Sequence, residues 1–183
     1  DKGMRTLAPQ TSLGSLEQEP TMDGFLTLGD SAGSGLDLSE AYRVDRAVEG
    51  LKFDPFRPVA TASGGERRRA AVAKLMAEAP ELMLFDEPTN HLDIEAIAWL
   101  EAELKSTKAG YVLISHDRAF LNNLTRATLW VDRGVVRRNE RGFDGFESWR
   151  DKLWEEEDIQ RHKMDQKIKM EPKPWLFNCS IVA

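Results

Sequence analysis

Two adjacent acidic residues follow a short apolar run near the middle of the chain. Asp86 and Glu87 come directly after the run 82–85, which predicts a strand buried on both faces. Because ligands of open α/β sheets bind at the carboxyl ends of the strands, both carboxylates would face a site. Asp86 would then hold Mg²⁺, which takes oxygen ligands, and Glu87 would deprotonate the water that attacks a phosphate. The alternative is an acidic pair that merely begins a loop.

A second pattern, earlier in the chain, is suited to phosphate binding. Ser63, Gly64, Gly65 and Glu66 precede an apolar stripe with helical spacing. Glycines allow backbone amides to approach a phosphate closely, and the N-terminus of a helix supplies positive potential. Glu66, three positions after Ser63, also predicts a capping box, in which each side chain bonds the backbone amide of the other residue. The alternative is a glycine-flanked helix cap without a ligand.

His116 and the polar loop 88–93 complete the set of candidates. His116 comes just past the apolar run 111–114, so it would lie at the same sheet edge as Glu87 and could bond a γ-phosphate oxygen. A histidine with a structural role is the alternative. The loop 88–93 is turn-forming, and Asp93 at its end is suited to cap the next helix.

The elements that must position these residues alternate between helix and strand. Helical patterns precede and follow the run 82–85, and the run 111–114 predicts a second buried strand. A short helix and a hairpin around the turn 132–134 come next. This alternation predicts βα units, and therefore an α/β fold with a mostly parallel sheet.

The chain divides into four segments by pattern. Residues 1–35 are weakly patterned and predict loops with one or two short elements, and their glycine-rich stretch 29–35 is interpreted as a loop. Residues 36–144 carry the motifs described above. Residues 145–171 predict a long polar helix, which prolines then end, and residues 172–183 form an irregular apolar tail.

Composition excludes several other classes of protein. Apolar residues make up 41% of the 183 residues, enough for a core, but no apolar stretch is long enough to span a membrane. Cys179 is the single cysteine, so an internal disulfide and a cysteine-based zinc site are excluded, and a reducing compartment fits. The net formal charge of −6 argues against a general polyanion binder.

In their order along the chain, these motifs resemble the ATP-binding cassette (ABC) family of ATPases. Residues 62–66 resemble the signature motif of that family, with Ala62 where leucine is usual, and residues 82–87 resemble its Walker B strand. Residues 91–93, which are His91, Leu92 and Asp93, resemble its D-loop. His116 resembles its switch histidine.

The resemblance implies a fold, a reaction and two cofactors. The fold would be part of a P-loop NTPase-type cassette with a small helical subdomain and a long C-terminal helix. ATP and Mg²⁺ would be bound, with Glu87 and His116 as catalytic residues and Asp86 near the metal. Residues 16–20 resemble the Q-loop of the family, so Gln18 would also contact the metal.

Residues 87–93 and 115–121 most resemble the F subfamily, and within it the Uup-like members. Proteins of this subfamily carry two cassettes in one chain and no transmembrane domain, and many act on the ribosome as translation factors. The helix from residue 145 resembles the start of the linker between the cassettes. The resemblance therefore implies a cytoplasmic protein whose linker could contact RNA through basic residues, namely Arg161, Lys163, Lys167 and Lys169. A solvated helix that contacts no RNA is the alternative.

The P-loop pattern G-x-x-x-x-G-K-[ST] does not occur in this sequence. We therefore expect a fragment, the C-terminal part of a first cassette, that carries half of each of two ATP sites. Ser63, Gly64 and Gly65 would serve an ATP bound by a second cassette, the expected partner, whereas Glu87 would serve the site that lacks its P-loop. The alternatives are the ATPase of a transporter or of a DNA-repair complex, and a non-catalytic remnant.

Overall fold

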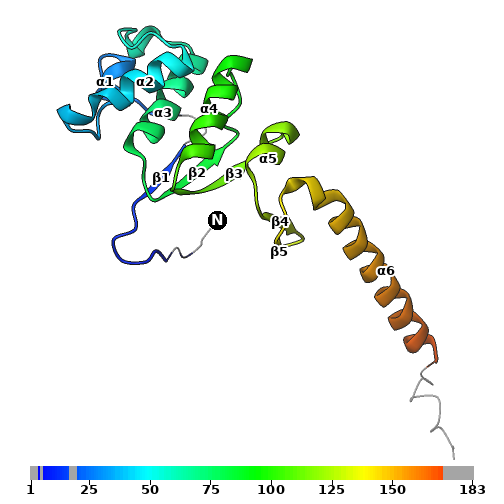
Figure 1. The fold of residues 1–183 in the computed structure, drawn as a ribbon. Coiled ribbons are helices and arrows are strands. Elements are labelled where there is room, and N and C mark those ends of the chain that lie inside the picture. The colour runs from blue at the N-terminus through cyan, green and yellow to red at the C-terminus, as the bar shows by residue number, and fades with distance from the viewer. Residues whose placement is uncertain (1–3, 5, 17–19, 171–183) are drawn as a thin grey trace, which may run out of the picture. The chain divides into compact units, whose positions relative to one another are not determined.

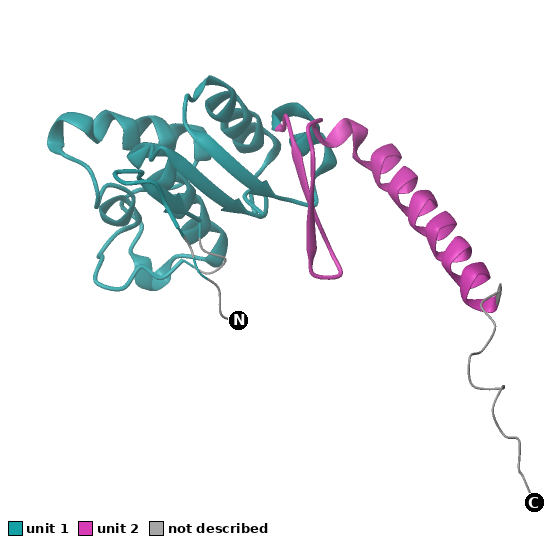
Figure 2. Ribbon diagram, turned by 90° about the horizontal axis from the view of Figure 1, so that it is seen from below, with its two compact units in different colours: residues 1–124 teal, residues 125–183 magenta. Residues whose placement is uncertain are grey.

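The computed structural model describes residues 4, 6–16 and 20–170. It divides into two compact units, residues 1–124 (unit 1) and residues 125–183 (unit 2), which are coloured separately in Figure 2. Each unit is described by itself below. In the described part of the chain, no helix is both long and apolar enough to cross a membrane.

Unit 1 is built on a three-stranded parallel sheet with β2 in the centre. The strands are β1 (Leu13–Ser15), β2 (Leu82–Asp86) and β3 (Gly110–Ile114). The helices are α1 (Leu28–Ala32), α2 (Ala41–Leu51), α3 (Gly64–Glu78), α4 (Ile94–Ser106) and α5 (Arg118–Leu124). Figure 1 shows α1 to α4 together on one side of the strands. This arrangement confirms the predicted α/β class and the parallel sheet.

The helices that flank β2 begin where their capping residues predict. Ser63 caps α3 and forms the full capping box with Glu66. Asp93 caps α4, because its Oδ1 accepts a hydrogen bond from the amide of Ala96 at 2.8 Å. Since these bonds join residues three positions apart, each helix start is determined locally and lies next to a loop that carries candidate site residues.

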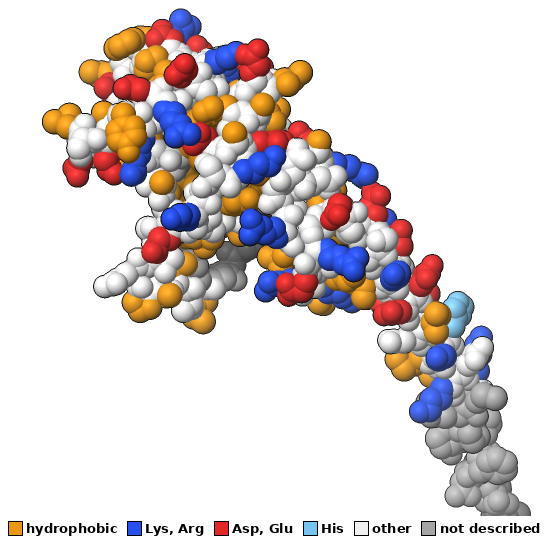
Figure 3. Space-filling view, viewed as in Figure 1, with side chains coloured by type: hydrophobic (Ala, Val, Ile, Leu, Met, Phe, Trp, Pro, Cys, Tyr) orange, Lys and Arg blue, Asp and Glu red, His pale blue; other side chains and the backbone are white. Residues whose placement is uncertain are grey.

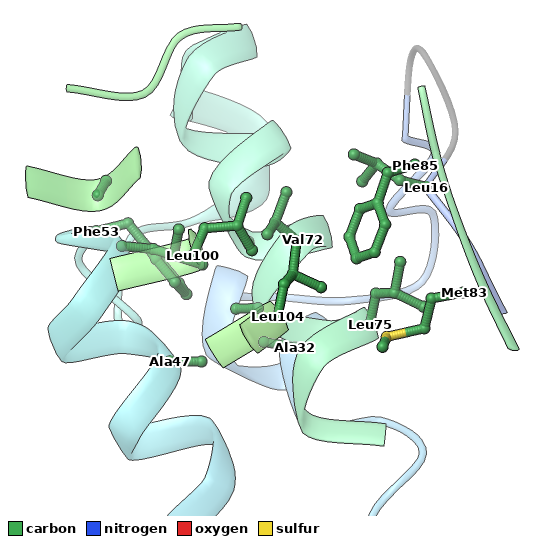
Figure 4. Close-up of a cluster of buried hydrophobic side chains, with 14 of the residues drawn as sticks. Leu16, Ala32, Ala47, Phe53, Val72, Leu75, Met83, Phe85, Leu100 and Leu104 are labelled. Carbon is green, nitrogen blue, oxygen red and sulfur yellow. The ribbon is translucent and has the colours of Figure 1, made fainter. Parts of the chain in front are cut away.

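The core of unit 1 consists mainly of aliphatic side chains, with phenylalanine rings among them, and lies between the sheet and the helices. Met83 and Phe85 of β2 are each 1% exposed and pack toward α3 and α4 (Figure 4). The remaining labelled core residues come from other parts of unit 1, and are Leu16, Ala32, Ala47, Phe53, Val72, Leu75, Leu100 and Leu104. Burial of these side chains supplies most of the favourable free energy of folding in unit 1.

The prediction that both central strands are buried on both faces is wrong. Val112 and Ile114 of β3 are 41% and 60% exposed, whereas Tyr111 and Leu113 pack against the core. In β2 the side chains alternate between buried and half-buried. The physical reason is that, within the described residues, the helices that pack on this sheet bury only one of its faces, which leaves the other face apolar and open.

The weakly patterned segment 1–35 contains two short elements, in agreement with the prediction of one or two. The glycine-rich stretch 29–35 is a loop only in part, because α1 occupies its beginning. Thr27 and Asp30 form a capping box that starts this helix. The second element, β1, leads directly into Leu16, and no strand was expected there.

Gly14 explains how β1 fits into the sheet. A Cβ atom at this position would lie 2.4 Å from Cδ1 of Leu75 and 2.8 Å from Cγ of Pro80. A side chain here would force Leu75 and the ring of Pro80 to move, so glycine suits the close approach of α3 and of the residues before β2 to β1.

Unit 2 consists of a hairpin and a long helix, both as predicted. Strands β4 (Thr128–Asp132) and β5 (Val135–Asn139) pair antiparallel, and a short 3-10 helix, Phe143–Gly145, leads into α6 (Phe146–Met170). The turn residues Arg133 and Gly134 have φ angles of 48° and 78°. Two consecutive positive φ angles form the type I′ turn that suits the twist of a hairpin.

Candidate functional site

The acids and the histidine predicted to meet at one sheet edge lie together. Strands β2 and β3 pair in register, with Asp86 opposite Ile114, so Glu87 and His116 follow neighbouring strand ends. The amide of His116 donates to Oε2 of Glu87 at 3.3 Å, and Nε2 of His116 lies 3.5 Å from Oε1. The Glu87 side chain is 20% exposed and the imidazole 99% exposed. The pair can therefore meet a ligand from solvent.

The backbone of Glu87 adopts a left-handed conformation, with φ at 48°. Its amide donates to the carbonyl of Ile114 at 2.7 Å, and its carbonyl accepts from the amide of Asn90 at 3.2 Å. This conformation is strained for a residue other than glycine, so the surrounding hydrogen bonds must stabilise the backbone of Glu87. The turn directs the Glu87 side chain toward His116 instead of continuing the strand.

Asp86 ends β2 on the open face of the sheet. Side chains alternate along a strand, so Asp86 shares a face with the half-buried Leu82 and Leu84, opposite Met83 and Phe85. No group of three or more His, Cys, Asp or Glu side chains that could hold a metal occurs in the described residues. A single carboxylate nevertheless fits Mg²⁺ that is bound mainly by substrate phosphates and water.

The N-terminus of α3 presents two glycine amides to solvent. Helix geometry leaves the amides of Gly64 and Gly65 without an acceptor inside the helix. A Cβ atom at Gly64 would meet nothing within 4 Å, so the space above this residue is open. An anion there would be within reach of both amides and of the positive end of the helix dipole.

The side chains of Ser63 and Glu66 are engaged with each other at this helix start. The Ser63 amide and hydroxyl donate to Oε2 of Glu66 at 2.8 and 2.7 Å. The bond from the Ser63 amide, and then that from its hydroxyl, hold the pKa of the Glu66 carboxyl below its ordinary value. The hydroxyl must therefore turn away from Glu66 before it can donate to a phosphate.

The loop after β2 approaches the start of α3. A Cβ atom at Gly65 would lie 3.4 Å from the Cβ atom of His91, so the two segments are in contact. His91 is exposed with φ at 65°, Leu92 packs against the core, and Asp93 caps α4. The structure thus brings the loop with His91 beside the helix that begins at Gly64.

One predicted residue is not described by the structure, and one residue that was not predicted contacts the site. Gln18 lies outside the described residues. Arg68, which no motif singled out, is 6% exposed and bonds the backbone carbonyls of Asp86 and Glu87. A signal was present in the sequence, because Arg68 falls on the apolar stripe of α3, four and seven positions before Val72 and Leu75.

Comparison with known proteins finds similarity to ATP-binding proteins. A family model described as ABC transporter matches residues 4–90. ATP-binding protein Uup of Caulobacter vibrioides is 36% identical over 176 residues, which are 96% of this chain and 28% of that protein. Energy-dependent translational throttle protein EttA of Mycobacterium tuberculosis is 44% identical over 104 residues, which are 54% of this chain and 19% of that protein.

A solved structure shows the same fold. The structure described as the ATP binding subunit of an ABC transporter superposes with a TM-score of 0.64 and 21% identity, over 70% of this chain and 59% of that one. The present chain spans less than a third of the length of the two curated relatives. The family model and these relatives together show that the chain is similar to ABC proteins.

Proposed function

We propose that this chain supplies the hydrolytic acid of an ATP site in an ABC-F ATPase. In this proposal Asp86 lies beside the Mg²⁺ that accompanies ATP, Glu87 activates the attacking water, and His116 bonds the γ-phosphate. The 3.3 Å and 3.5 Å contacts between Glu87 and His116 carry the proposal. They support it because a carboxylate and an imidazole that lie side by side at the carboxyl ends of parallel strands could act as a base and as a phosphate donor.

The start of α3 takes a separate role in the same proposal. The open amides of Gly64 and Gly65, with Ser63 and Glu66 as the cap, would bind the phosphates of a nucleotide held by a second cassette. Support comes from the open space above Gly64 and from the position of His91 against Gly65. A second cassette is therefore the proposed partner, and it or another segment would have to supply the lysine-bearing phosphate loop that this sequence lacks.

The role of Glu87 is tested in a chimera. Residues 20–170 replace the matching residues of the Caulobacter Uup protein, which supplies the remaining parts of a cassette pair. Glu87→Gln keeps the shape of the side chain and removes the base, so ATP binding should persist while hydrolysis slows by about 10²–10⁴-fold. Steady-state phosphate release and ATP affinity are the measurements.

Glu49→Gln, which removes an exposed carboxylate from α2, is the matched control and should hydrolyse ATP at the rate of the unaltered chimera. Unchanged turnover in the Glu87→Gln chimera would remove Glu87 from the mechanism. Tight binding of Mg·ATP by the isolated chain would contradict the need for a partner.

Action on the ribosome is the finer part of the proposal. It rests on the relatives named energy-dependent translational throttle protein EttA. The proposal that the protein acts in the cytoplasm rests on the same relatives. On the face shown in Figure 3, Lys and Arg side chains mix with Asp and Glu side chains along the first part of α6, and Lys and Arg side chains predominate toward the end of its described residues. Co-sedimentation of the chimera with ribosomes tests this part. Absence of co-sedimentation would favour the ATPase of a transporter or of a DNA-repair complex instead.

A further inference from the structure

Three consecutive arginines near the start of α3 bond three different stretches of backbone. Arg67 donates to the carbonyl of Val59 at 2.9 Å, and Arg69 donates to the carbonyl of Lys52 at 3.3 Å. Only Arg68 points toward the sheet. It is 6% exposed, although arginine is rarely buried without a specific partner.

Arg68 contacts the backbone of both candidate acids. Its Nη2 atom donates to the carbonyl of Asp86 at 2.5 Å and to the carbonyl of Glu87 at 2.9 Å. The end of β2 is therefore bonded to α3 by a buried, charged donor, and such bonds are stronger than those between neutral groups.

This link acts at the point where the backbone of Glu87 is left-handed. The amide of Glu87 is held by Ile114 at 2.7 Å, and its carbonyl is held by Arg68 at 2.9 Å. Together with the bond from the Asn90 amide to the same carbonyl, these bonds hold both peptide groups of Glu87, and its carboxylate accepts from the His116 amide. The orientation of the acid therefore depends on a side chain from α3.

We propose that Arg68 is the positioning residue through which helix α3 sets the orientation of Glu87. The same helix begins at Gly64, so a shift of its N-terminus when an anion binds there would be transmitted by Arg68 to the acid that faces His116. The importance of this link for hydrolysis rests on the function proposed above. The link itself exists without nucleotide and is measured without it.

The test uses the 183-residue chain and compares Arg68→Met with Arg69→Met by nuclear magnetic resonance. Arg68→Met removes the donor to the two carbonyls but keeps an apolar stem, whereas Arg69→Met removes an arginine that bonds elsewhere. Hydrogen exchange of the Glu87 amide should accelerate at least about tenfold in Arg68→Met only, since hydrogen bonds to charged groups are strong. Exchange of the Leu100 amide in α4 should not change, which separates a local effect from global destabilisation.

A second measurement tests the orientation of the Glu87 carboxylate. Glu87→Gln should shift the amide resonance of His116 in the wild-type background, because that amide donates to the Glu87 carboxylate. In the Arg68→Met background the same substitution should no longer shift it, and in the Arg69→Met background the shift should persist. This cycle detects coupling that a purely structural arginine would not produce.

The proposal is overturned if Glu87 exchange and the His116 response are the same in Arg68→Met and Arg69→Met. If Arg68→Met does not fold, Arg68→Lys carries the test, because lysine keeps the charge but is a shorter, non-planar donor. Faster Glu87 exchange in Arg68→Lys supports the link, and wild-type exchange overturns it. The outcome is independent of the chimera test, so failure of the link and failure of the hydrolytic role are distinguishable.

Discussion

Each of the two units of this chain is stabilised internally by a different kind of side chain. Unit 1 buries aliphatic residues that lie far apart in sequence, such as Leu16, Met83 and Leu104. In unit 2, Trp130 lies 5.9–6.1 Å from three other aromatic rings, all in edge-to-face geometry, and they belong to Phe146, Trp149 and Trp154. Edge-to-face contact between rings is a favourable electrostatic arrangement.

Arginines cover the rings of unit 2. Arg150 lies 4.6 Å from the ring centre of Trp154, and Arg137 lies 5.5 Å from that of Trp130. Arg137 also pairs with Glu157 of α6 at 2.5 Å. Cations over aromatic faces and an ion pair between β5 and α6 thus add to the ring contacts.

The difference shows where chemistry is possible in this chain. In unit 1 the sheet brings residues 29 positions apart, Glu87 and His116, to the same edge, and every described candidate residue for ATP binding and hydrolysis lies in this unit. Unit 2 joins elements that are close in sequence and carries none of those residues. We therefore expect long-range packing to control the site, and local aromatic packing to control the start of α6.

A large-to-small substitution in the buried core of unit 1 should have the largest effect. Phe85→Ala removes a ring that is 1% exposed, and should lower the free energy of unfolding of unit 1 by about 3–5 kcal/mol. Hydrogen exchange with mass spectrometry, read from peptides of unit 1, measures the change. Val112→Ala on the open face of the sheet is the control and should cost only about 0.5 kcal/mol. Equal losses would mean that the two faces of the sheet are packed alike.

Loss of the central ring should have an intermediate effect. Trp130→Ala removes three ring pairs, each worth about 0.5–1.5 kcal/mol, and should destabilise the hairpin and the first turns of α6 by about 2 kcal/mol. Exchange of the amides in residues 128–157 reports the change. Val131→Ala alters the neighbouring residue, which is 69% exposed, and should leave these amides protected. Full protection in Trp130→Ala would show that the ring cluster does not hold unit 2 together.

The capping box of α3 should have the smallest effect, and a pH-dependent one. Ser63→Ala should cost about 1 kcal/mol near neutral pH. Because the pKa of Glu66 is lower in the folded than in the unfolded chain, its ionisation adds stability that is complete above the ordinary glutamate pKa. This contribution is lost as the pH falls through the lowered value. Urea titrations between neutral and acidic pH measure it.

Glu66→Gln should remove this part of the pH dependence, whereas Glu49→Gln should preserve it. If the three chains lose stability in parallel on acidification, Glu66 does not contribute through its charge. That result would leave the start of α3 determined by the serine hydroxyl alone.

Much of the fold and of the site was predictable because its signals are local. Ser63 with Glu66, and Asp93 with Ala96, act over three residues, so the starts of α3 and α4 follow from neighbouring side chains. The meeting of Glu87 and His116 was predictable because both follow strands of a parallel sheet. The roles of all the candidate site residues, Glu87 and His116 included, stay predictions.

Other features were not predictable from local pattern. Strand β1 has three residues, one of them glycine, and its neighbour is a strand 69 positions away. No propensity within so short a segment can indicate such a pairing. The open face of β3 was also missed, because an apolar run shows that a strand can be buried but does not show how many faces are covered.

The amino-acid sequence by itself determined the elements, their caps and the residue types placed at the strand ends, because those depend on interactions between near neighbours. Only the tertiary structure decided that α3 reaches Glu87 through Arg68, that β1 joins the sheet, and that one sheet face stays open. Those outcomes depend on which distant segments pack against each other. The free energy gained on burial depends on the total apolar area that two surfaces remove from water, and no single residue determines it.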